Sequence, residues 1–173
     1  MKLSAIRKIF VLLAFLLTGV QALKAQEENV IAIAVYNFTR YIDWPADQAN
    51  KDFLIDVIGH KSVYDKLKEI SAGRKVGNRS IIVRYLETPD KVTASEILFV
   101  GFWQSKDMPK ILDKVKSAST LLITEKDGQI ESGSGINFVI RNNAIKFEVK
   151  KSNIVKYGLI LSETLEQMAF KAY

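Results

Sequence analysis

The chain of 173 residues contains no cysteine, and His60 is its only histidine. Without cysteine, disulfide bonds, thiol catalysis and thiolate metal sites are excluded. A single histidine likewise excludes a metal site built from several histidines of one chain. We therefore expect no metal and no other cofactor, and we expect the fold to be held together by its hydrophobic core alone.

The sequence also lacks an apolar run long enough to cross a membrane as a helix, which takes about 20 residues. The apolar run at residues 9–17 follows a positively charged start and precedes a small residue, Ala25. This order is typical of a cleavable export signal. We predict that residues 1–25 are removed and that residues 26–173 form one exported domain that does not insert into the membrane. An uncleaved membrane anchor is the alternative.

The net charge of +6 depends strongly on this first segment, which carries four basic residues and no acidic one. Its removal leaves a formal charge of +2. The basic composition then gives little support to a nucleic-acid partner, and we expect none.

The stretch at residues 132–150 predicts a β-hairpin around Asn142-Asn143, because asparagine tolerates the positive φ angles of tight hairpin turns. Pairing across this turn places three apolar pairs on one face of the hairpin and leaves its other face exposed to solvent. A shift of one residue would scatter the pattern, so the register is well specified. The apolar pairs are Ile140–Ile145, Phe138–Phe147 and Ile136–Val149, and the opposite face pairs Val139 with Lys146 and Asn137 with Glu148.

Four nearly continuous apolar runs, at residues 53–58, 81–83, 97–100 and 121–123, are typical of strands covered on both faces of a parallel sheet. Asp56 interrupts the first run. It is either a hydrogen-bonded structural carboxylate or a catalytic acid, and the first interpretation is favoured because no second carboxylate is placed beside it.

Apolar residues at helical spacing predict helices around these strands. The expected helices are residues 29–42, 63–71 and 108–117, a short turn capped by Ser152, and a last helix from a Ser162 cap to Ala172. The expected buried stripes are Val30, Ile31, Ala34, Val35, Phe38, Tyr41 and Ile42 on the first helix, and Leu165, Met168 and Ala169 on the last. This order predicts an α/β fold: a single-domain mixed-sheet sandwich with parallel central strands, a C-terminal antiparallel hairpin and flanking helices.

An ordered set of short motifs resembles the YfiR family of small periplasmic proteins across essentially the whole mature chain. The motifs are Tyr36-Asn37-Phe38, Tyr41-Ile42, Trp44-Pro45, residues 73–79, residues 97–101, residues 135–139, residues 145–149 and Gly158-Leu159. The resemblance implies an α/β periplasmic domain that is often dimeric. It also implies a regulatory role, since the founding member restrains a membrane-bound diguanylate cyclase by binding its periplasmic sensor domain.

The chain departs from the founding member in one respect. That protein carries cysteines that form disulfides, whereas here Ser95 precedes the strand at residues 97–100 and no cysteine is present. Disulfide-based redox sensing therefore does not carry over.

A small-molecule pocket is one candidate site. In open α/β sheets, ligands bind outside the carboxyl ends of the strands. The residues that follow the predicted strands and would meet at that edge are His60, Phe102, Trp103, Gln104 and Glu125. The alternative is that the aromatic residues merely cap the core and that His60 is a solvated loop residue.

A partner-binding face is the second candidate site. Tyr36 and Arg40 lie four residues apart on the side of the first helix opposite its predicted core stripe, and Trp44 follows its end. Tyrosine, tryptophan and arginine are enriched at binding hot spots. Ordinary surface, with Trp44 packed inward, is the alternative.

The sequence offers little for catalysis, and we expect no enzymatic activity. No nucleophile motif is present, and Ser132-Gly133-Ser134-Gly135 matches a phosphate loop only in its glycine content, because it leads into a hairpin and not into a helix. Together with the resemblance to the YfiR family, this implies a non-catalytic periplasmic regulator that binds the exported sensor domain of a membrane protein of the diguanylate cyclase or histidine kinase type. The alternative is a periplasmic small-molecule-binding protein.

Overall fold

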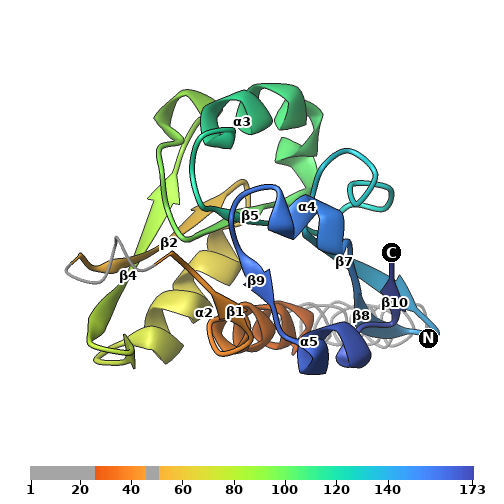
Figure 1. Ribbon diagram of the computed structural model, residues 1–173, viewed down its shortest axis with the longest axis horizontal. Helices are drawn as coiled ribbons and strands as arrows, with labels where there is room; N and C mark the ends of the chain where they lie inside the picture. Colours follow the sequence, from red (N-terminus) through yellow and green to blue (C-terminus); the bar gives the residue numbers. More distant parts are fainter. Residues whose placement is uncertain (1–25, 46–50) are drawn as a thin grey trace, which may run out of the picture.

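The computed structural model describes residues 26–45 and 51–173 (Figure 1). The predicted export signal, residues 1–25, lies outside the described residues. A first helix occupies residues 26–38. The other helices are α2 (Lys61–Ser71), α3 (Met108–Val115), α4 (Lys151–Val155) and α5 (Glu163–Met168), with 3₁₀ turns at η2 (Pro89–Lys91) and η3 (Phe102–Asp107).

An eight-stranded sheet runs through the middle of the domain in the order β10-β8-β7-β6-β5-β2-β4-β3. Its strands are β2 (Phe53–Ile58), β3 (Lys75–Val76), β4 (Arg79–Leu86), β5 (Ile97–Val100), β6 (Leu121–Thr124), β7 (Ile136–Arg141), β8 (Ala144–Val149) and β10 (Lys171–Ala172). The central strands β4, β2, β5, β6 and β7 are parallel, as the apolar runs predict. Two further strands, β1 (Ile42–Asp43) and β9 (Ile160–Leu161), form a separate antiparallel pair.

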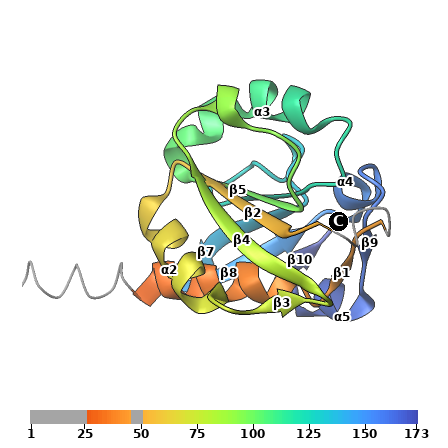
Figure 2. The same cartoon turned by 90° about the vertical axis from the view of Figure 1, so that its left-hand side faces the viewer.

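Helices cover both faces of this sheet (Figure 2). The first helix and α2 pack on one face, where Val63 and Leu67 of α2 belong to the larger core cluster. On the other face, α3 packs through Met108, Ile111 and Val115 against a second cluster. Since α2 links β2 to β4 and α3 links β5 to β6, the chain winds in opposite directions on the two sides of β2. The adjoining carboxyl ends of β2 and β5 are therefore the topological switch point of the sheet.

The structure confirms the predicted hairpin. Asn142 and Asn143 have φ angles of 53° and 56°, and every predicted pair is present, Phe138 with Phe147 included. Both rings contact Phe38 of the first helix, with centroids 6.0 and 5.3 Å away.

The prediction that the opposite face of the hairpin is exposed to solvent is wrong for most of that face. Asn137, Val139 and Glu148 are all buried. The Thr124 hydroxyl donates to Asn137 Oδ1 at 2.6 Å, which satisfies this amide oxygen inside the fold.

The first helix ends earlier than predicted, at residue 38 and not at residue 42. The Thr39 hydroxyl donates to the Tyr36 carbonyl at 2.7 Å and so competes with the helical backbone bond. Ile42 gains a strand partner instead, since it pairs with Leu161. The predicted buried stripe is also rotated, because Val30 is exposed whereas Tyr36 is buried.

The C-terminal helix is likewise shorter than predicted. Ser162 caps it as expected, with its Oγ accepting from the Leu165 amide at 3.2 Å. The helix ends at Met168, which is exposed and not buried, because the Phe170 amide donates to the Phe147 carbonyl and starts β10 beside β8. Ser152 lies inside α4, whose N-cap residue is Lys150, so the predicted Ser152 cap is wrong.

The hairpin pairs provide a graded test of the core. Phe138 is 3% exposed, so Phe138→Ala should lower the free energy of unfolding by about 3–5 kcal/mol. Phe147→Ala should cost less, because that ring is only partly buried. Ile140→Ala, at a side chain that is 58% exposed, should change stability by no more than about 0.5 kcal/mol. Urea unfolding measures all three, and a larger loss for Ile140→Ala than for Phe138→Ala would contradict this assignment of faces.

Candidate functional site

A cavity of about 720 Å³ opens at the carboxyl ends of the parallel strands. Its volume is in the range of small-molecule binding sites. Residues that follow β2, β5 and β6 line it together with residues of β7, β8 and the first helix. They are Glu27, Glu28, Ile31, His60, Phe102, Glu125, Lys126, Asp127, Phe138, Val139, Ile140 and Ile145.

Two glycines bring the chain segments at the switch point into close approach. Gly59 has a φ of 76°, which favours glycine, and it directly precedes His60. A Cβ at Gly101 would lie 2.5 Å from the Gly59 carbonyl oxygen, so a larger residue could not fit there without a backbone shift. This approach places His60, at the end of β2, beside Phe102, at the end of β5.

Glu125 joins these two segments. Its Oε1 accepts from the Phe102 amide at 2.6 Å, and its Oε2 lies 3.6 Å from His60 Nε2. His60 also caps α2, since its Nδ1 accepts from the Val63 amide at 3.5 Å. In the neutral imidazole the proton therefore resides on Nε2, the nitrogen nearer to Glu125.

Burial raises the pKa of Glu125 above the usual value of 4.5, and the negative charge of Glu28 raises it further. His60 and the Phe102 amide act in the opposite direction. The Glu125 side chain is only 11% exposed. Largely buried carboxylates with a raised pKa are concentrated at functional sites.

The structure brings together three of the five predicted ligand-site residues: His60, Phe102 and Glu125. Trp103 does not line the cavity; the residue is 80% exposed, and its ring packs edge-on against the Phe102 ring with the two centroids 5.2 Å apart. Gln104 supports the turn from outside the cavity, where it donates to Asp107.

Sequence reasoning missed the other lining residues. The part from the hairpin, Val139, Ile140 and Ile145, follows from the parallel pairing of β7 with β6, which places the end of β7 at the same edge. Glu27 and Glu28 reach the cavity because the first helix packs across the sheet, and no sequence pattern indicates that docking.

The predicted partner-binding residues have different environments. Tyr36, expected at the surface, is only 9% exposed. Its ring lies beneath two guanidinium groups, with the Arg74 and Arg40 Cζ atoms 4.9 and 5.5 Å from its centroid. Polar contact with Arg74, and then with Arg40, lowers the pKa of the Tyr36 hydroxyl. The Tyr36 ring is buried on the apolar side of the helix, and the guanidinium groups of Arg40 and Arg74 lie over the ring.

Trp44 also packs inward. Its Nε1 donates to the Glu96 carbonyl at 3.1 Å, and its ring meets the Phe53 ring edge-on at 4.9 Å. Of the three predicted residues, Arg40 alone is exposed. Arg74, which the sequence reasoning did not select, joins it.

Asp56 has the structural role favoured from the sequence. It is completely buried and accepts two hydrogen bonds of 2.7 Å from Arg84. The loop at residues 132–135 forms a turn into β7, and the Ser134 hydroxyl is buried in a hydrogen-bond network with Thr124. Neither feature provides a reactive group.

Two negative findings apply to residues 26–45 and 51–173. No cluster of three or more acidic, histidine or cysteine side chains in these segments could hold a metal ion. No helix within them has the length and apolar character needed to cross a membrane.

The fold and the cavity define an α/β domain of the doubly wound type, with a pocket at the switch point. The chain belongs to the YfiR/HmsC-like family, whose model matches residues 28–169. Membership points to a periplasmic regulator of diguanylate cyclase signalling, in a family that is typically non-catalytic. No curated protein sequence matches the chain significantly.

Eight chains of solved structures match the fold. One of them was solved as the ABC domain in complex with L-Trp from Streptococcus pneumonia, with a TM-score of 0.52 and 9% sequence identity. The match covers 70% of this chain and 55% of that one, so the present chain corresponds to little more than half of the other protein. At this identity the likeness shows the fold alone.

The raised pKa of Glu125 gives a pH-dependent prediction. Between pH 4.5 and its raised value, the folded state binds more protons than the unfolded state, so stability falls as the pH rises through this window. Glu125→Gln removes the charge and keeps the shape. Its melting temperature should exceed that of the wild type at neutral pH, and the difference should vanish below pH 4.5.

Thermal melts at a series of pH values measure this difference. Glu131→Gln, at an exposed residue of the same loop, is the matched control and should show no such gain. A melting temperature that is lower for Glu125→Gln at neutral pH would show that the carboxylate stabilises the fold.

Proposed function

We propose that the protein is a non-catalytic periplasmic regulator that binds the exported sensor domain of a membrane signalling protein and modulates its output. Export after cleavage of residues 1–25 is part of this proposal. The observation that carries it is the family match, which spans nearly all of the described domain. Two buried carboxylates, Asp56 and Glu96, each pair with an arginine, which suits a structural and not a catalytic use.

The arginine face, defined by Arg40 and Arg74 over the Tyr36 ring, is the surface that we propose for protein contact. Both arginines are exposed. Among residues 26–45 and 51–173, neither guanidinium has a carboxylate within 4 Å. Both guanidinium groups rest against the buried Tyr36 ring, so less side-chain entropy is lost when they bind a partner. This arrangement suits an acidic surface on the membrane partner or on a second copy of the chain.

The test is the double charge reversal Arg40→Glu with Arg74→Glu, which leaves the buried Tyr36 in place. Immobilised protein is used to capture partners from solubilised membranes, and the captured fraction is assayed for diguanylate cyclase and histidine kinase activity. The reversal should weaken capture at least tenfold, or about 1.4 kcal/mol. Sedimentation measures self-association of the same variants.

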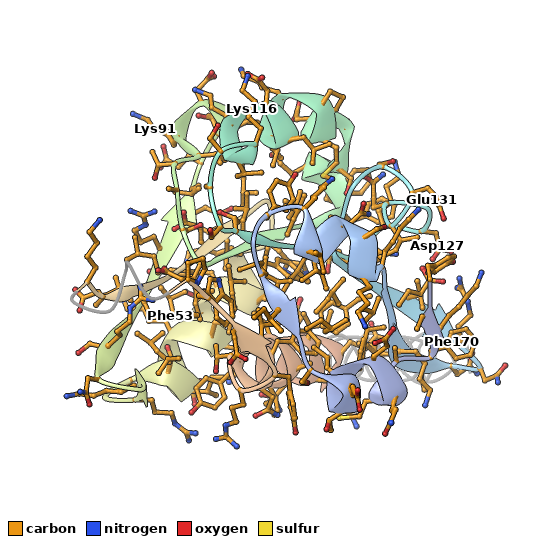
Figure 3. The ribbon with its side chains drawn as sticks, in the orientation of Figure 1. Phe53, Lys91, Lys116, Asp127, Glu131 and Phe170 are labelled. Carbon is orange, nitrogen blue, oxygen red and sulfur yellow. The ribbon has the colours of Figure 1, made fainter. Side chains whose placement is uncertain are left out.

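The matched control is Lys91→Glu with Lys116→Glu, which makes the same change of charge on the α3 side of the molecule (Figure 3). It should leave capture unchanged. Equal capture by the wild type and both double variants would place the partner contact elsewhere. If the wild type captures neither activity, the regulatory function itself is contradicted.

Ligand binding in the cavity is the second candidate function. Two observations favour it: the cavity opens at the switch point, and the largely buried Glu125 carboxylate lines it. The two functions are compatible, because the arginine face and the cavity share no residue.

A further inference from the structure

The cavity has the lining of a site for one kind of small molecule. Its apolar wall consists of Ile31, Phe138, Val139, Ile140 and Ile145, and Phe102 adds an aromatic surface at the opening. Phe102 is 45% exposed, so its ring remains accessible to a ligand. Such a wall suits a compact apolar body, and a ligand with several polar groups would leave them without hydrogen-bond partners there.

The charged groups of the lining are predominantly acidic. Four carboxylates, on Glu27, Glu28, Glu125 and Asp127, face one lysine, Lys126. Asp127 has a partial partner outside the cavity, since Arg141 Nη1 lies 3.5 Å away. The Lys126 ammonium group lies over the Phe102 ring, with Nζ 5.6 Å from the ring centroid.

The remaining carboxylates come from two segments of the chain that meet at the cavity. Their negative charges therefore add there. Glu27 and Glu28 lie on the first helix, and Glu125 follows β6. His60 Nε2 lies 3.6 Å from Glu125 Oε2, where a neutral imidazole can donate a hydrogen bond to the carboxylate. An anionic ligand would be repelled by this lining, whereas a cation would supply the missing charge.

We propose that the cavity binds a small organic cation, in which an apolar body of about the size of one aromatic ring carries a protonated amine. The amine meets Glu125 and Glu28, and the body lies against Phe138, Ile145 and Phe102. This inference rests on the ligand-binding function proposed above and adds the chemical class of the ligand.

The test uses three probes with the same phenyl body and different end groups: phenethylammonium, 2-phenylethanol and 3-phenylpropionate. Titration calorimetry at neutral pH measures their affinities for the purified protein. Phenethylammonium should bind at least tenfold more tightly than the other two. Glu125→Gln should reduce that preference at least tenfold, whereas Glu131→Gln, on the same loop but outside the lining, should preserve it (Figure 3).

Glu28→Gln provides a second removal of charge from a different element, so the test stands even if one variant fails to fold. It should also reduce the preference for the cation. If all three probes bind equally, or if the anion binds best, the cation specificity is overturned while the pocket remains. If no probe binds at millimolar concentration, the ligand-binding function fails as well.

Discussion

Burial of the central parallel strands on both faces is the constraint on which the rest of the structure depends. The side chains of β5 and β6 are buried along their whole length, and successive side chains of a strand point to opposite faces. Each face therefore needs its own helical cover, and the chain supplies α2 on one side and α3 on the other. The change of side creates the switch point, and the cavity opens there.

The sequence predicted best those elements whose pattern is set by their own residues. The hairpin alternates apolar and polar side chains at period two, and only one register keeps its three apolar pairs together. Continuous apolar runs likewise identified the central strands. The pattern could not reveal β10, because two residues beside β8 form a strand only through tertiary pairing.

The candidate sites divide in a similar way. His60, Phe102 and Glu125 could be predicted because strand ends meet at one edge of a parallel sheet. Tyr36 was assigned to the wrong side, since helical spacing does not show that Arg40 and Arg74 can cover a buried ring. Glu27 and Glu28 were missed because their role depends on how the first helix docks. Local periodicity identifies faces, but it does not tell which neighbour a face will meet.

The position of β10 has a consequence for the behaviour of the protein at high concentration. This short strand lies along the outer edge of β8, where the hairpin would otherwise present unpaired backbone groups to another molecule. Exposed sheet edges promote intermolecular strand pairing, and short strands with lysine are a common protection against it. Residues 170–173 cover this edge through the backbone hydrogen bonds that the Phe170 and Tyr173 amides donate to the hairpin, and they place Lys171 there. We therefore expect this segment to disfavour strand pairing between molecules.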